Sequence, residues 1–339
     1  MQALQKKQKT WVLLLLGALL GLATFLCLYG TAPLDPANDA WIWYGYDETD
    51  ILQHYAGWVL FRNSHWALPP GLCDTLAAAL DESGETTSLQ TVSYSDTTWA
   101  LLFNAAEGSV FQNQQLRQAL AGIARENADV PSSGLYAAAK GLVPEGLTVD
   151  GLDYRETAGD PLPTIPEPKA LYLAARQGMA TSDFSGVTLL LPKNAGLGEL
   201  ADQINSAWQK ECSLFFSVEE VEQDEFDARI AAGKYTIALA PIRAEGGSVY
   251  QMLQQFTTAG GSLTGYADTV YADRLALSAQ QTGKDRCALL AQCERQLLES
   301  CTVVPLLAQQ KRLLLANGVR DLVFDPFFPV LDLTWAKMS

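Results

Sequence analysis

The stretch Phe226–Ala240 reads FDARIAAGKYTIALA and combines a short helix, a turn and a strand. Phe226 and Ile230 lie four residues apart, which is the spacing of one helical face. Gly233 ends the helix, because glycine readily adopts the left-handed conformation found at helix C-termini. Tyr235–Ala240 follows as an apolar run of strand length. A helix that leads directly into a buried strand is typical of α/β proteins.

The flanking sequence repeats this alternation of strands and helices. Further strands are predicted at Trp99–Asn104, Val187–Leu191, Leu214–Val221, Val303–Leu307 and Arg312–Leu315. Helices are predicted over Phe111–Asn127, around Leu200–Trp208, after Asp224, after Ser248, and over about 269–281 and 284–300. Asn113, Asp224 and Ser248 are the predicted N-caps. The run Asp160–Pro168 is predicted to be an extended loop, because proline cannot donate the hydrogen bonds of helices and sheets.

Composition and motifs narrow the classes of function. The 339 residues include 38 acidic and 23 basic side chains, and the net charge of −15 argues against nucleic acid as a partner. The two histidines, His54 and His65, both lie near the N-terminus, where packing at the membrane interface explains them better than metal binding. The sequence contains no G-x-S-x-G, HExxH or Walker motif. We therefore expect no catalytic residues, no metal, no cofactor and no enzymatic activity.

The N-terminus carries a candidate membrane span. Three lysines precede Trp11–Gly30, which contains no charged side chain. A helix of that length covers about 30 Å, the thickness of a bilayer's hydrocarbon core. The lysines predict a cytoplasmic end at residues 1–10 and an extracytoplasmic bulk from residue 31 onward. A cleaved signal peptide is the alternative, but the long apolar run and the lack of a small-residue cleavage site favour a single-pass anchor in the cell membrane.

An aromatic and acidic segment follows the span. Residues 31–75 are predicted to be a juxtamembrane loop, and 76–92 a junction before a soluble lobe at 93–339. Residues of about 11–72 resemble the first span and outer loop of multi-spanning family-C glycosyltransferases, which would imply catalytic or metal-binding roles for Asp47 and Asp50. No second long apolar run is present to complete such a site, so a solvated acidic loop is the favoured interpretation.

Several motifs in the lobe occur together in one known family. They are WALLFN at 99–104, LRQAL at 116–120, GLVP at 141–144, FDARIAAGKYTIALA at 226–240, GYAD at 265–268 and ERQLLESCTVVPL at 294–306. In this order they resemble the C-terminal half of the family 5 extracellular solute-binding proteins, the peptide- and nickel-binding components of ABC importers. Thr236 departs from the pattern, because that family usually carries aspartate at this position.

The resemblance implies a fold and a function. It implies one α/β lobe plus hinge strands of a type II periplasmic-binding-protein-like fold, preceded here by the single transmembrane helix. It implies capture of a short peptide or similar small polar solute, with an ABC importer permease and the membrane as partners. Family members are roughly twice as long outside the membrane, so we expect a missing cleft wall and weak binding. A fragment of the glycosyltransferase type and a non-functional fusion of two gene fragments remain the alternatives.

Loops at strand ends supply the ligand contacts in that family. The resemblance therefore points to Arg243, Glu245, Gly246, Gly247 and Tyr266 as candidate ligand-binding residues. Arg243 would pair with a peptide carboxylate, and backbone N–H groups before the Ser248 cap would receive the same group. A solvated turn with a surface Arg–Glu pair is the alternative for the loop, and a core position is the alternative for Tyr266.

Arg117 and the cysteines carry structural predictions that do not belong to the candidate site. Arg117 is expected to be a surface or hinge ion-pair partner. The six cysteines show no C-x-x-C pair and no zinc-ribbon spacing. Cys27 falls in the predicted span, and the other five are predicted to be buried free thiols.

Overall fold

The computed structural model describes residues 89–131, 135–258, 261–316, 319–321, 323–325, 327–332 and 337–338. The predicted span at 11–30, the loop at 31–75 with Asp47 and Asp50, and most of the junction at 76–92 lie outside these ranges. Within them, every helix is too short or too polar to cross a bilayer. The membrane anchor and its orientation therefore stay predictions.

Contacts between residues divide the chain into two compact units. One comprises residues 94–310 and 326–328, and the other comprises 1–93, 311–325 and 329–339. The second unit contributes three two-stranded sheets among the described residues, which pair β1 with β10, β11 with β14, and β12 with β13. These strands are β1 (Leu89–Tyr94), β10 (Lys311–Ala316), β11 (Val319–Arg320), β12 (Val323–Asp325), β13 (Phe328–Asp332) and β14 (Lys337–Met338).

A six-stranded mixed sheet forms the centre of the first unit, with the strand order β3-β9-β2-β8-β6-β7. Its strands are β2 (Thr97–Phe103), β3 (Tyr136–Ala138), β6 (Thr188–Pro192), β7 (Ser217–Val221), β8 (Ile237–Arg243) and β9 (Val303–Gln309). The strands β6, β7 and β8 run parallel, whereas β2 is antiparallel to both of its neighbours. A small separate hairpin pairs β4 (Thr148–Val149) with β5 (Leu152–Asp153).

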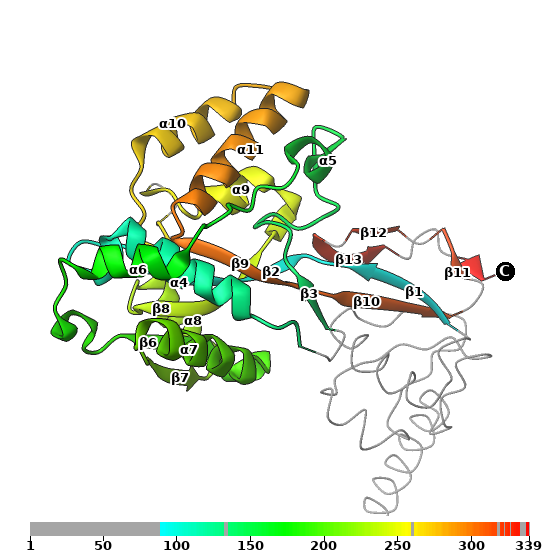
Figure 1. The fold of residues 1–339 in the computed structure, drawn as a ribbon. Coiled ribbons are helices and arrows are strands. Elements are labelled where there is room, and N and C mark those ends of the chain that lie inside the picture. Colours follow the sequence, from blue (N-terminus) through cyan, green and yellow to red (C-terminus); the bar gives the residue numbers. More distant parts are fainter. Residues whose placement is uncertain are drawn as a thin grey trace, which may run out of the picture. The chain divides into compact units, whose positions relative to one another are not determined.

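Helices pack on both faces of this sheet (Figure 1). The α-helices are α4 (Gln114–Asn127), α5 (Tyr154–Ala158), α6 (Pro168–Arg176), α7 (Gly198–Cys212), α8 (Gln223–Ala231), α9 (Val249–Gln254), α10 (Thr269–Ser278) and α11 (Gly283–Glu299). Short 3-10 turns are η3 (Val110–Gln112), η4 (Thr181–Phe184), η5 (Lys193–Ala195) and η6 (Glu245–Gly247). The α/β class predicted from the sequence is confirmed.

The alternation of side chains along β2 explains the two cores. Leu101 and Phe103 belong to one hydrophobic cluster with residues of α4, α6 and α7, whereas Ala100 and Leu102 belong to a second cluster with residues of α9, α10 and α11. Successive residues of a strand point to opposite faces of its sheet, so an unbroken apolar strand requires a helical layer on each side.

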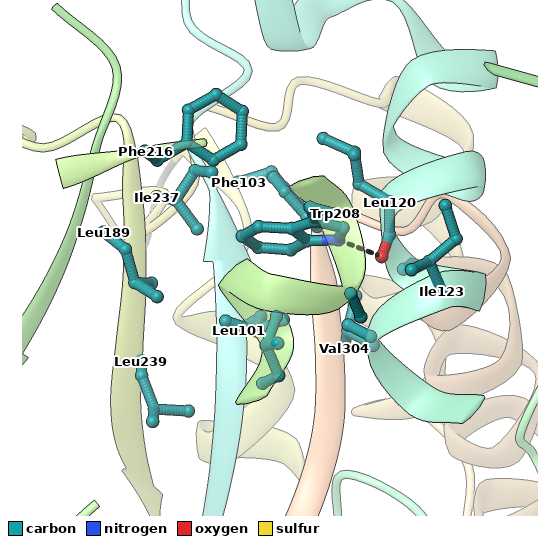
Figure 2. Packing of buried hydrophobic residues seen from close by; sticks show 14 of the residues in the cluster. Leu101, Phe103, Leu120, Ile123, Leu189, Trp208, Phe216, Ile237, Leu239 and Val304 are labelled. Carbon is teal, nitrogen blue, oxygen red and sulfur yellow. Dashed lines mark hydrogen bonds between the residues drawn. The ribbon is translucent and has the colours of Figure 1, made fainter. Parts of the chain in front are cut away.

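Trp208 lies at the centre of the first cluster (Figure 2). This side chain is completely buried, and its ring packs edge-on against Phe216 and tilted against Phe103. Its indole Nε1 donates a hydrogen bond of 2.9 Å to the carbonyl oxygen of Leu120 in α4, and Figure 2 shows this bond. A buried indole needs such a partner, so the bond fixes α7 against α4.

A buried carboxylate organises the other face. Glu294 of α11 is fully buried and accepts hydrogen bonds from the backbone N–H groups of Leu142 and Val143. It also accepts the Tyr154 hydroxyl at 2.9 Å and forms an ion pair with Arg155 at 3.0 Å. Each of its oxygens is therefore compensated, and the cluster ties the 141–144 turn and α5 to α11.

The predicted N-caps have different outcomes. Asn113 caps α4 by accepting from the Leu116 N–H, and Ser248 caps α9 by accepting from the Gln251 N–H. The predicted cap at Asp224 is wrong, because α8 begins at Gln223 and Asp224 lies in its first turn. A carboxylate there still interacts favourably with the helix dipole.

Two other sequence predictions are corrected by hydrogen bonds. The strand predicted from Leu214 begins only at Ser217, because the Asn205 side-chain amide exchanges two hydrogen bonds with the backbone N–H and carbonyl of Phe216. Arg117 is not a surface or hinge ion-pair partner. It is 6% exposed, and its guanidinium donates to the backbone carbonyls of Phe111, Gln112 and Ser300.

The described cysteines are buried free thiols, as predicted, at Cys212, Cys287, Cys293 and Cys301. Cys27 and Cys73 lie outside the described residues. Burial raises the pKa of the Cys212 and Cys293 thiols to about 12, so both stay protonated at neutral pH.

Candidate functional site

The central sheet splits at the carboxyl ends of its parallel strands. β6 pairs with β8 only at Leu189–Ile237 and Leu190–Ala238. Beyond these pairs β6 continues beside β7 up to Pro192, while β8 continues beside β2 up to Arg243. Proline has no N–H to donate to a neighbouring strand, so Pro241 favours an end of pairing on this stretch of β8.

The chain reverses its winding direction at the same place. The connection from β6 runs through α7, whose buried residues belong to the first cluster, whereas β8 leads into α9, whose residues belong to the second. Adjacent strands whose connections leave on opposite faces define a topological switch point. Open α/β sheets bind ligands in the crevice outside such strand ends.

A polar groove of about 480 Å³ lies beside the end of β8. Its lining residues come from α8, β8 and α9, and they are Gln223, Asp227, Pro241, Arg243, Gln251, Met252 and Gln255. Gln223 and Asp227 on α8 are four residues apart and share a helix face. The same spacing relates Gln251 and Gln255 at α9. The groove therefore combines amides, one carboxylate and one guanidinium.

The charged groups of the groove differ in their partners. Asp227 accepts a hydrogen bond of 2.9 Å from the Gln223 side-chain amide, which holds the carboxylate in place. Arg243 is exposed and forms no ion pair with any other side chain that the structure describes. The guanidinium is thus available for a carboxylate, and Asp227 for an ammonium group.

The loop that follows Arg243 does not offer its glycine N–H groups to a ligand. The Gly246 N–H donates to the Phe327 carbonyl at 3.2 Å, and the Gly247 N–H donates to the Ala244 carbonyl at 3.1 Å. Both glycines have positive φ angles, 65° and 63°, which form the turn η6 before α9. Both N–H groups are thus bonded within the chain, and the binding roles of Gly246 and Gly247 stay predictions. The side chain of Glu245 lies outside the described part of the structure.

Tyr266 does not lie beside Arg243. The residue next to it, Gly265, approaches the backbone of Ala106, just beyond the C-terminal end of β2, whereas Arg243 pairs with Thr97 at the N-terminal end of β2. Six residue steps along β2 separate these ends, a distance of about 20 Å. Tyr266 is half-buried, donates its hydroxyl to Asp268 at 2.7 Å and has a pKa raised by burial. The five predicted site residues thus belong to two separate places.

The amides and the carboxylate of the groove were not among the predicted site residues. The sequence does hold a signal for them, which is paired polar residues at helical spacing on both sides of a buried strand. The pairs are Gln223 with Asp227 on α8, and Gln251 with Gln255 near α9. Within the described ranges, no group of three or more His, Cys, Asp or Glu side chains is arranged to hold a metal ion.

Comparison with known proteins gives a fold and no family. Residues 18–105 match a domain of unknown function, DUF6311. No curated protein matches the chain significantly. The comparisons give no support to a glycosyltransferase resemblance for residues 11–72.

Solved structures of peptide-binding proteins share the fold. The substrate-binding domain of an oligopeptide ABC transporter from Bacillus anthracis matches at a TM-score of 0.63 and 17% identity, over 80% of this chain and 57% of that protein. OppA from Listeria monocytogenes, solved with bound peptide, matches at a TM-score of 0.59 and 19% identity, over 77% of this chain and 52% of that protein. A dipeptide-binding protein from Pseudoalteromonas, in complex with Met-Leu, matches at a TM-score of 0.60 and 13% identity, over 86% of this chain and 55% of that protein.

The chain spans little more than half the length of these structures. At such low identities the likeness shows a shared fold and no more. What the lobe binds has to be argued from its own groove.

Proposed function

We propose that this chain is the extracytoplasmic, membrane-anchored binding component of an ABC importer and that it captures a short peptide or a related small polar solute. The groove beside the end of β8 is the proposed contact surface. The chain performs capture and delivery to the permease, with no chemical step.

One observation carries this proposal. The sheet splits at a topological switch point, and the groove at that point holds Arg243, which has no ion-pair partner among the described side chains. The shared fold supports the same function, because the matching structures include peptide-binding proteins of ABC transporters. The uncharged run at Trp11–Gly30 supports the anchor.

The groove suggests how a peptide is held. Arg243 pairs with the terminal carboxylate of the peptide, and Asp227 receives its ammonium group. The amides of Gln251 and Gln255 supply donors and acceptors for the peptide backbone. Recognition of termini and backbone predicts tolerance of different ligand side chains, because none of these contacts depends on their identity.

Isothermal titration of the full chain in detergent with pooled di- to pentapeptides tests this function. Arg243→Ala removes one charge-assisted hydrogen-bonded pair, worth about 2 kcal/mol, and therefore weakens binding roughly 30-fold. Arg295→Ala is the matched control, because Arg295 is an exposed arginine on α11 outside the groove.

Two results would defeat the proposal. One is the absence of heat with every peptide pool at millimolar concentration. The other is equal affinity for the Arg243→Ala and Arg295→Ala variants. C-terminally amidated peptides should lose affinity for the unmodified chain and show no further loss with Arg243→Ala.

A further inference from the structure

A second polar pocket lies at the other end of β2 from the groove. It has a volume of about 590 Å³, and residues that line it include Ala105, Glu107, Gln112, Arg117 and Tyr266. None of these residues lines the groove at Arg243. The pocket is therefore a separate feature, and the proposed function does not use it.

Arg117 is the unusual residue of this pocket. Although it lines the pocket, it is only 6% exposed. Its Nε donates to the Ser300 carbonyl at 2.9 Å, and its Nη1 donates to the carbonyls of Phe111 and Gln112. Among the described residues, Nη2 has no hydrogen-bond partner and the guanidinium has no carboxylate within ion-pair distance.

The surroundings of the guanidinium compensate its charge only in part. Ser300 follows the end of α11, and Phe111 and Gln112 end the turn η3, so the bonded carbonyls are those that helix ends leave free. Burial still disfavours the cation and lowers the pKa of Arg117. An anion at Nη2 would supply the missing opposite charge.

Gln112 also lines the pocket and offers a second donor. Its backbone carbonyl lies 3.1 Å from Arg117 Nη1, and its exposed side-chain amide forms no hydrogen bond within the described part of the chain. One guanidinium N–H and one amide N–H match the two oxygens of a carboxylate. Glu107, also on the pocket wall, disfavours the additional charge of a phosphate.

The pocket walls are fixed by close packing. The Ala105 N–H donates to the Thr264 carbonyl at 2.7 Å, which joins the segment after β2 to the loop before α10. At Gly265 an added Cβ would lie only 2.7 Å from the Ala106 backbone nitrogen, so glycine permits this approach. The pocket residues Ala105 and Tyr266 thus lie on two connected segments.

We propose that this pocket binds the carboxylate group of a small solute, through Arg117 Nη2 and the Gln112 side-chain amide. The pocket is open and polar, so affinity lies in the millimolar range. A free amino acid and the C-terminus of a short peptide present the same group, and both are tested below.

Saturation-transfer NMR on the full chain in detergent measures such weak binding. The probes are N-acetyl-L-alanine, which carries a carboxylate and no ammonium, L-alanine, L-alanyl-L-alanine, L-alaninamide and inorganic phosphate. The proposal predicts millimolar binding of N-acetyl-L-alanine, no binding of L-alaninamide, and no competition by phosphate. Binding of L-alanine without the dipeptide identifies a free amino acid as the source, and the reverse identifies a peptide C-terminus.

Variants of Gln112 locate the binding without disturbing the buried arginine. Gln112→Glu adds a carboxylate of the protein itself to the pocket wall and should weaken N-acetyl-L-alanine binding at least tenfold. Gln112→Ala removes one hydrogen bond to the charged carboxylate and should weaken it about tenfold. Gln280→Glu adds the same charge at an exposed position outside the pocket and should leave binding within twofold of the unmodified chain.

Arg243→Ala removes the guanidinium of the groove, so N-acetyl-L-alanine binding that persists in this variant and is weakened by a further Gln112→Glu change belongs to this pocket. Loss of binding in Arg243→Ala would assign the signal to the groove and overturn the second site. Binding of L-alaninamide equal to that of N-acetyl-L-alanine, full retention in Gln112→Glu, or no signal at 50-fold probe excess at about 20 mM would also overturn it.

Discussion

Replacement of Glu294 by glutamine should strongly destabilise the lobe. The carboxylate is completely buried and accepts bonds from two backbone N–H groups, the Tyr154 hydroxyl and both terminal nitrogens of Arg155. Glutamine keeps the volume of the side chain but turns one acceptor into a donor that faces other donors. It also leaves the Arg155 guanidinium, whose side chain is 11% exposed, without its counterion.

Breaking a buried ion pair by removal of one partner costs about 3 to 5 kcal/mol. For a unit of this size each kcal/mol corresponds to roughly 2–4 °C in melting temperature, so Glu294→Gln should lower it by roughly 6–20 °C. The assay is thermal unfolding of the full chain in detergent, followed by tryptophan fluorescence, to which the buried Trp99 and Trp208 contribute.

Glu299→Gln provides the matched control. Glu299 is exposed at the end of the same helix, so its replacement should shift the melting temperature by less than 2 °C. The double variant Glu294→Gln with Arg155→Met should be less destabilised than the sum of its single changes, because the orphaned cation is gone. Equal melting temperatures for Glu294→Gln and Glu299→Gln would refute the structural role of the cluster.

Two further predictions concern backbone packing and thiol chemistry. Gly265→Ala should destabilise the lobe by at least about 2 kcal/mol more than Gly108→Ala in chemical unfolding. Both glycines have positive φ, but only at Gly265 would an added Cβ meet the Ala106 backbone. Equal losses of stability in the two variants would contradict this. Cys212 should resist iodoacetamide at pH 8 in the folded chain, because burial raises its pKa to about 12 from 9.0. In the unfolded chain the thiol ionises near pH 9, so the free energy of unfolding should fall as pH rises from 9 to 12; rapid labelling of the folded chain would disprove the burial.

The sequence predicts the elements of this lobe well where periodicity and caps agree. Asn113 and Ser248 cap their helices as expected, and the apolar runs around Leu101 and Leu190 are central strands. Local signals suffice at these places because each depends on neighbours within a few residues.

Local signals fail where a partner distant in the sequence decides the structure. The strand expected from Leu214 starts late because Asn205 binds the backbone of Phe216. The helix α6 was not predicted, because the preceding prolines indicate an extended loop. Pro168 nevertheless starts that helix, at a position that does not need an N–H donor.

At the candidate site, too, the sequence predicts local features and misses those that depend on distant strands. The sequence places Arg243 after a strand, and that position is observed. It does not reveal that β2 runs antiparallel to β8, and this direction separates Tyr266 from Arg243. The groove itself depends on the early end of β6–β8 pairing at Ala238, which has no local signature apart from Pro241.

Photo-crosslinking tests the proposed peptide groove most directly. A short peptide with a photoreactive side chain is irradiated with the full chain in detergent, and the modified residues are identified by mass spectrometry. The proposed function predicts labelling of Gln251 and Gln255, reduced by excess unlabelled peptide and by Arg243→Ala. Labelling that spares these residues, or that Arg243→Ala leaves undiminished, would contradict peptide capture in this groove.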